Sequence, residues 1–125
     1  MNKLLWIGVA GAAGAISRTL IGQLVFAESG FPLSTFLVNS IGTFLLCFIV
    51  SGAFRKRKIN KEIEDAVTIG FLGSFTTFSA LSMETVLLVE NGQLFIALLY
   101  VSMSILIGSS AGLLGFHFGG KRVAE

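Results

Sequence analysis

Hydroxyl, glycine and phenylalanine residues cluster inside the third apolar stretch of this chain, over residues 70–79. A helix in lipid gains nothing from the four hydroxyl groups of this segment, because buried polar groups cost free energy unless they are paired. A helix break that lines a polar path or an ion site would need them. We therefore expect the function to lie here. Unwinding of residues 73–79 would leave backbone carbonyls to side chains, water or a monovalent cation.

A second polar group lies in the preceding apolar stretch, where Thr35, Asn39, Gly42 and Thr43 share one helical face. Asn39 is the costly member, since lipid cannot satisfy the donors and acceptors of its carboxamide. It has two interpretations, an interhelical hydrogen bond worth about 1 kcal/mol or a place in the lining of a polar path. The accompanying hydroxyl groups favour the lining role.

Arg18 is a cation inside the first apolar stretch. Its long side chain could extend to the membrane surface as a structural anchor. It could equally face a water-filled vestibule and attract anions. The sequence does not separate these two roles.

Hydrogen-bond donors outnumber acids at membrane depth. Residues 66–83 and the last apolar stretch contain no Asp or Glu, whereas a proton-coupled or cation-selective path normally carries one. Glu84 is expected to pair with a donor near the membrane surface rather than to move charge. Phe71, Phe75 and Phe78, spaced i, i+4 and i+7, either face lipid or turn their electropositive ring edges towards an anion. The donors that favour an anion are Asn39, Thr76, Thr77, Ser79, Tyr100 and Ser104.

The elements that must position these residues are membrane helices. Of the 125 residues, 54% are hydrophobic and 13% charged, and the mean hydropathy is +0.85, which is too apolar for a soluble domain of this length. We predict an all-α membrane protein with a break in the third helix, in which the first helix is not a cleaved signal peptide. The four transmembrane helices are expected at about 4–25, 33–54, 66–89 and 94–118, in a single domain 1–125.

Small residues recur at helical spacing, among them Gly8 and Gly11 in the first helix and Gly108 and Gly112 in the last. Such rows let helix backbones approach closely in lipid, either within one subunit or between subunits. Because four helices of this size can hardly enclose a pore, we expect a second subunit to supply the other wall.

The positive charges are distributed on one side of the predicted membrane. Eight of the nine Lys and Arg residues lie before the first helix, between the second and third, or after the fourth, and none lies in 26–32 or 90–93. The positive-inside rule therefore places both termini in the cytoplasm. A nucleic-acid surface is not expected, because these charges flank the membrane and lack interleaved aromatic residues.

Residues for enzyme chemistry are scarce. Cys47 is the only cysteine and lies in an apolar helix, so it is expected to be inert packing. The only histidine, His117, is expected to anchor the last helix at the membrane surface. With no metal-ligand spacing and no cluster of carboxylates with histidine, we expect the protein not to be an enzyme.

Three blocks in order resemble the Fluc/CrcB family of small fluoride channels, over nearly the whole chain. The first is GAAGA at 11–15 followed by Arg18, the second is FLVNSIG at 36–42, and the third is GFLGSFTTFS at 70–79. The third block is highly specific. The resemblance implies an antiparallel dimer in the cell membrane with two pores, through which fluoride leaves the cell passively.

The resemblance also assigns residues. It implies a structural sodium ion at the centre of the dimer, held by the backbone carbonyls of Gly73 and Thr76 from both subunits. It places Asn39 in the pore lining and makes Phe78 one ring of a phenylalanine pair. The anion path would further include Thr77, Ser79, Tyr100, Ser104 and, near the vestibule, Arg18.

The chain departs from the family pattern in two ways. Ala80 and Leu81 stand where the family has a threonine and a second phenylalanine. In addition, an antiparallel homodimer needs a subunit that inserts both ways, whereas the charges here fix one orientation. We therefore expect a paralogous partner of opposite orientation that supplies what this chain lacks, and otherwise a homodimer.

Two alternatives remain at this stage. A small multidrug-type proton antiporter also has four helices in a short chain, but it would need a glutamate in the first helix, where this chain has Arg18. A partner subunit that does not conduct is the other alternative, and Leu81 favours it.

Overall fold

The computed structural model describes residues 2–25 and 28–124, with the backbone alone for 122–124. The described residues are helical with short connections, and they form no strand. Four helical stretches are long and apolar enough to cross a membrane: Lys3–Leu24, Leu33–Lys56, Lys61–Glu90 and Leu94–Lys121. The predicted all-α fold with four transmembrane helices is confirmed.

The first two spans have different geometry. Helix α1 (Lys3–Leu24) is continuous. The second span consists of α2 (Leu33–Phe48), a π-helical segment η1 (Ile49–Ala53) and a short α3 (Phe54–Lys56). A positive φ of 126° at Gly52 kinks the chain within η1, a conformation that glycine adopts without a Cβ clash.

The third span is divided into four elements and begins before the predicted residue 66. It comprises α4 (Lys61–Asp65), η2 (Ala66–Leu72), α5 (Gly73–Phe75) and α6 (Phe78–Glu90). The early start has a local cause, since the Asn60 side chain accepts a hydrogen bond from the Glu62 N–H and caps the first turn. The fourth span, α7 (Leu94–Ala124), continues past the predicted residue 118.

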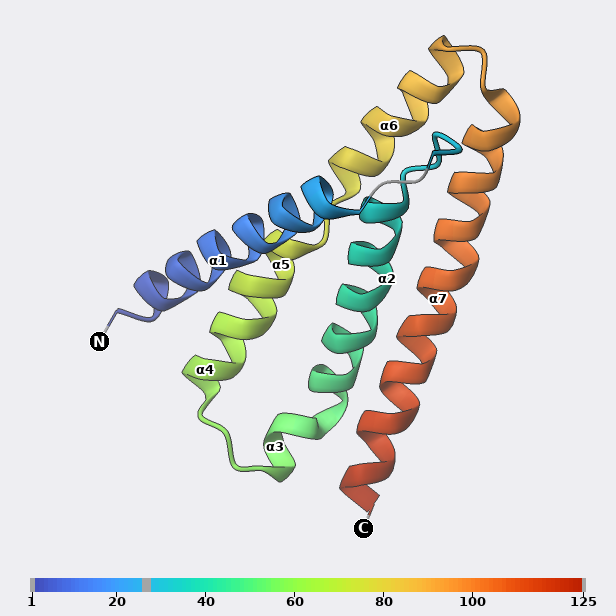
Figure 1. Cartoon of the computed structure of the whole chain (residues 1–125). Coiled ribbons are helices and arrows are strands. Elements are labelled where there is room, and N and C mark those ends of the chain that lie inside the picture. Colours follow the sequence, from blue (N-terminus) through green and yellow to red (C-terminus); the bar gives the residue numbers. More distant parts are fainter. Residues whose placement is uncertain (1, 26–27, 125) are drawn as a thin grey trace.

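The helices pack in two close pairs (Figure 1). Helix α7 lies along α2 and η1, while α1 crosses η2 and α5. Glycine permits both approaches: a Cβ at Gly14 would collide with the carbonyl of Phe71, and one at Gly115 with the carbonyl of Phe44. By contrast, Gly8 and Gly108 have open space around them.

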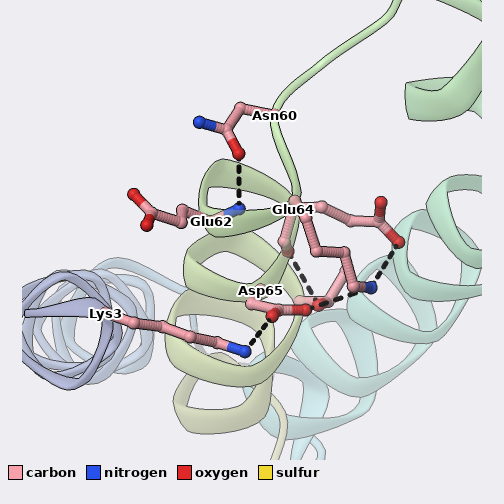
Figure 2. Close-up of polar contacts among 7 residues, drawn as sticks. Lys3, Asn60, Glu62, Glu64 and Asp65 are labelled. Atoms are coloured by element: carbon pink, nitrogen blue, oxygen red, sulfur yellow. Dashed lines mark hydrogen bonds and ion pairs between the residues drawn. The ribbon is translucent and has the colours of Figure 1, made fainter.

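An ion-pair cluster fastens the start of α1 to α4 (Figure 2). Asp65 is buried and receives Lys3 at 2.6 Å and Lys61 at 3.2 Å, and Lys61 also lies 3.4 Å from Glu64. Both termini and the α3–α4 turn lie towards this end of the molecule, and the α6–α7 turn lies at the other end. The α1 crossing is therefore held at its start by charge and along its length by glycine packing.

Two apolar clusters form the core on either side of the break in the third span. One contains Val38, Leu72 and Phe75, and the other surrounds Tyr100 and Leu88. Large apolar side chains elsewhere are exposed, as expected for a surface that lipid or another subunit covers.

Candidate functional site

The break in the third span is short. Only residues 76 and 77 are non-helical, with ψ 150° at Thr76 and φ −151°, ψ 121° at Thr77. The predicted unwinding over 73–79 is therefore too wide. The helix resumes at once because Thr77 caps α6: its Oγ1 accepts a hydrogen bond of 3.2 Å from the Ala80 N–H.

Asn39 of α2 holds the break from the side. Its Nδ2 donates to the carbonyl of Thr77 at 3.0 Å, and its Oδ1 accepts from the Thr77 N–H at 2.7 Å. A backbone N–H can only donate and a carbonyl can only accept, so these partners fix which way the carboxamide points. Asn39 thus supplies to Thr77 the two hydrogen bonds that a continuous helix would supply.

The same arrangement leaves two carbonyls without their usual helical donors. An unbroken α-helix would direct the Thr77 N–H to the Gly73 carbonyl and the Ala80 N–H to the Thr76 carbonyl. Here these N–H groups donate to Asn39 Oδ1 and to Thr77 Oγ1 instead. The carbonyls of Gly73 and Thr76 can therefore accept from another donor or bind a cation.

A groove runs beside the break, and we call it the Phe78 groove. It has a volume of about 440 Å³. Phe78 is 80% exposed in this groove, and Leu81 lies on it with part of its side chain in the Tyr100 cluster. The groove is lined by Asn39, Thr43, Gly73, Thr76, Thr77, Phe78 and Leu81.

A second groove, the Arg18 groove, lies on the other side of Thr77 and has a volume of about 640 Å³. Thr77 lines both grooves, and its Oγ1 lies 3.1 Å from the hydroxyl of Ser79. The polar residues of the second groove come from α1, α2, α6 and the break, and they include both signs of charge. They are Arg18, Thr19, Ser34, Thr35, Thr77, Ser79 and Glu84.

Glu84 lines the Arg18 groove, although the sequence did not place it among the candidate site residues. Its two carboxylate oxygens accept hydrogen bonds from the Thr35 hydroxyl at 2.8 Å and from the Tyr100 hydroxyl at 2.7 Å. The prediction that Glu84 pairs with a donor is confirmed. An acid inside an apolar span is itself a sign of a functional site, and that signal could have placed Glu84 among the candidates.

Tyr100 and Ser104 lie away from both grooves. Tyr100 is fully buried and contacts the Arg18 groove through Glu84. Ser104 follows one turn later on α7, and its Oγ is a buried side-chain oxygen with no hydrogen-bond partner in the described part of the chain. The structure therefore brings Asn39, Thr77 and Phe78 together at one groove and places Tyr100 and Ser104 in the lining of neither groove.

The three phenylalanines of the third span do not share a face. Phe71 and Phe75 stack at 5.6 Å with Phe75 buried in the core, whereas Phe78 is exposed beyond the break. The prediction of one phenylalanine face is wrong because the two non-helical residues rotate the helix that follows.

Comparison with known proteins identifies the chain at family level. A family model described as CrcB-like protein, Camphor Resistance (CrcB), matches residues 5–116. This chain belongs to the CrcB family. The match includes every candidate residue of the two grooves and of the break.

Curated relatives of this family member are similar over most of their length. A protein of Desulfitobacterium hafniense named fluoride-specific ion channel FluC 1 is 45% identical over 82% of this chain and 90% of that protein. FluC 1 of Bacillus cereus is 42% identical over 95% of this chain and 90% of that protein. FluC of Geobacter sulfurreducens is 43% identical over 91% of this chain and 96% of that protein.

Proposed function

We propose that this chain is a subunit of a fluoride-specific ion channel that lets fluoride leave the cell passively. The observation that carries the proposal is the Asn39–Thr77 pair, which stabilises a helix break at membrane depth beside the exposed Phe78. The names of the curated relatives indicate that the transported ion is fluoride. Because fluoride is small and tightly hydrated, a selective path has to replace its water with donors and ring edges.

The anion path is proposed to run along the break, through the two grooves that share Thr77. Asn39 donates one amide hydrogen to Thr77 and keeps the other for an anion. Thr77 and Ser79 share one hydroxyl hydrogen bond, so one of their two hydrogens also remains available. Phe78 can present its positive ring edge, and Arg18 would attract anions at the mouth of its groove.

Tyr100 and Ser104 are proposed to continue this path as a polar track. The Tyr100 hydroxyl donates to Glu84, so it becomes available to an anion only when that contact opens. Ser104 needs no such release, because its buried hydroxyl has no other partner among the described residues. Because a buried hydroxyl is normally hydrogen-bonded, a small anion that accepts from Ser104 would be favoured at this position.

A structural sodium ion is proposed to bind the carbonyl oxygens of Gly73 and Thr76. These oxygens fit the ion because their helical donors point elsewhere and both residues line the Phe78 groove. Two carbonyls are too few for a hard cation, so a second subunit would contribute the same pair at the centre of a dimer. When bound, the ion would supply a fixed positive charge to the break.

The second subunit is proposed to be antiparallel, and a paralogue of opposite orientation rather than a copy of this chain. Lys and Arg flank one end of the helices, and the turns at the other end contain neither. Ala80 and Leu81 also leave this side of the path without a hydroxyl and a ring. A paralogue would supply both; a homodimer is the remaining possibility.

A non-conducting partner subunit is the second candidate function, and Leu81 is the observation that favours it. Leu81 lines the Phe78 groove, where an aliphatic side chain offers no positive ring edge to an anion. In that case the anion path would lie on the partner, and this chain would only support the assembly.

Growth of a fluoride-sensitive strain tests the channel and distinguishes a heteromer from a homodimer and from an antiporter. Expression with the paralogue should restore growth in fluoride, whereas expression alone should not. Rescue by this chain alone would contradict the heteromer and support a homodimer. Resistance to drugs instead of fluoride would indicate an antiporter, and the absence of any rescue with both proteins present in the membrane would contradict the channel.

The protein is proposed to lie in the cell membrane with both termini in the cytoplasm. Tags at the two termini should be inaccessible from outside intact cells, because the Lys and Arg residues flank that side. Equal labelling from inside and outside would show two orientations and would favour the homodimer.

A further inference from the structure

The cations at one end of the molecule divide into two sets. Lys3 and Lys61 form ion pairs with the buried Asp65 and with Glu64 (Figure 2). The cations of α3 and its turn have no carboxylate within ion-pair distance among the described residues. These unpaired cations, which we call the α3 cluster, are Arg55, Lys56, Arg57 and Lys58.

The α3 cluster has a defined backbone. At the end of α3 the Ile59 N–H donates to the Phe54 carbonyl at 3.1 Å, and the Lys58 N–H donates to the Arg55 carbonyl at 3.0 Å. This is the Schellman arrangement, which closes a helix with one residue in the left-handed region. The turn therefore presents its cations from a fixed scaffold.

Lys58 occupies the position in this turn where glycine is favoured. Its φ is 52°, and it is the one non-glycine residue with positive φ in the described chain. A side chain is disfavoured in this region, so a lysine here adds a cation at a cost in backbone conformation. Packing does not account for the choice, since Lys58 is exposed.

The surroundings of the α3 cluster fit a membrane surface. Val50 of η1, the segment that directly precedes α3, is 49% exposed. The last turns of α7 pack on η1, which brings the exposed Lys121 to the same end of the molecule. Glu62 is the carboxylate of this end that forms no ion pair within the described residues. The local charge is strongly positive beside exposed apolar surface.

We propose that the α3 cluster binds the headgroups of anionic phospholipids. Arg guanidinium groups bind phosphate oxygens in pairs, and Lys ammonium groups act as point charges. A cluster of four or more cations directly beside a transmembrane helix is typical of anionic-lipid recognition. In the proposed orientation these lipids belong to the cytoplasmic leaflet. The site is separate from the anion path and from the residues that line it.

Lipid binding to the purified protein tests this site without depending on its orientation in a membrane. Native mass spectrometry in a nonionic detergent would compare dioleoylphosphatidylglycerol, dioleoylphosphatidylcholine and free glycerol 3-phosphate. We expect the protein to bind the phosphatidylglycerol at least tenfold more tightly than the phosphatidylcholine. We also expect weak binding of the free phosphate, because it lacks the acyl chains. Equal binding of both lipids would overturn the proposal.

Two variants separate lipid binding from structure. Lys58→Gly removes one cation and relieves the positive φ, so it should keep or raise the unfolding temperature while weakening phosphatidylglycerol binding roughly fivefold. The control is Lys61→Gln, which removes a paired cation and should change this binding less than twofold. Unchanged binding in Lys58→Gly, or an equal loss in both variants, would contradict the α3 cluster as the site.

Discussion

The carboxamide of Asn39 forms two hydrogen bonds with the backbone of Thr77, at 3.0 and 2.7 Å. One side chain on α2 thereby substitutes for the helical partners that Thr77 loses between α5 and α6. This pairing lets a break exist at membrane depth without unsatisfied backbone groups at Thr77. It also directs the Thr77 N–H away from the Gly73 carbonyl, so the candidate cation site and the candidate anion path depend on the same residue.

Replacement of Asn39 should affect stability and transport together. Asn39→Asp keeps an acceptor for the Thr77 N–H but repels the Thr77 carbonyl and places a negative charge beside the path. We expect it to abolish fluoride efflux and to destabilise the protein by about 1–3 kcal/mol. Thermal unfolding in detergent and efflux from liposomes measure the two effects.

Ser40→Ala is the matched control for Asn39→Asp. The Ser40 hydroxyl donates within its own helix to the Phe36 carbonyl at 2.8 Å, so its loss should leave efflux and unfolding close to those of the natural chain. Normal efflux in Asn39→Asp would remove Asn39 from the pore.

The approach of α2 to the break can be tested at Gly42. A Cβ at this position would collide with the Cγ2 of Thr76, so Gly42→Ala should displace the break and cost about 1–3 kcal/mol. Gly8→Ala introduces the same group into open space on α1 and should be neutral or slightly stabilising. Equal unfolding temperatures for the two variants would show that the Gly42 contact does not position the break.

The sequence predicts the place of the break but not its length. Glycine and hydroxyl residues over 70–79 indicate a weak helix in lipid, and this signal is local. Its limits depend on Asn39, thirty-eight positions earlier in the chain, and on the Thr77 cap of α6. The residue spacing within 70–79 gives no information about a hydrogen-bond partner on another helix. The same short break explains why Phe71, Phe75 and Phe78 do not share a face. Their i, i+4, i+7 spacing places them on one face only if the helix is uninterrupted.

Glu84 and Tyr100 should be energetically coupled. Glu84→Ala would leave the Tyr100 hydroxyl buried without its acceptor, at a cost of about 1–3 kcal/mol. Tyr100→Phe removes that hydroxyl, so the double variant should be less destabilised than the two single effects added together, by about 1 kcal/mol. Strict additivity of the unfolding free energies would contradict a direct contact.

The carboxylate of Glu84 illustrates a second limit of the sequence. The family resemblance implies that Tyr100 lies on the anion path, and its hydroxyl counts among the donors at membrane depth. The structure shows that a carboxylate from another helix already accepts from it. Composition indicates which donors exist, whereas only tertiary contacts indicate which of them are already satisfied.

The ion-pair cluster predicts the effect of charge at the start of α1. Asp65→Asn keeps the size of the side chain but removes the charge that faces Lys3 and Lys61. The free energy of unfolding should fall by only about 1–2 kcal/mol, because water can solvate these partly exposed cations after the ion pairs are lost. Glu62→Gln removes the same charge from a half-buried position on the same helix that forms no ion pair among the described residues, and it should leave the unfolding temperature unchanged. An equal loss in both variants would indicate a general effect of charge and not the Lys3 contact.

The most direct test of the proposed function is ion-selective efflux from liposomes. Vesicles loaded with potassium fluoride or potassium chloride, and containing this chain together with its paralogous partner, are treated with a potassium ionophore while electrodes follow each anion. The proposed channel should release fluoride rapidly and retain chloride, and Asn39→Asp should stop the release. Retained fluoride, or chloride release at the same rate as fluoride, would contradict the assignment.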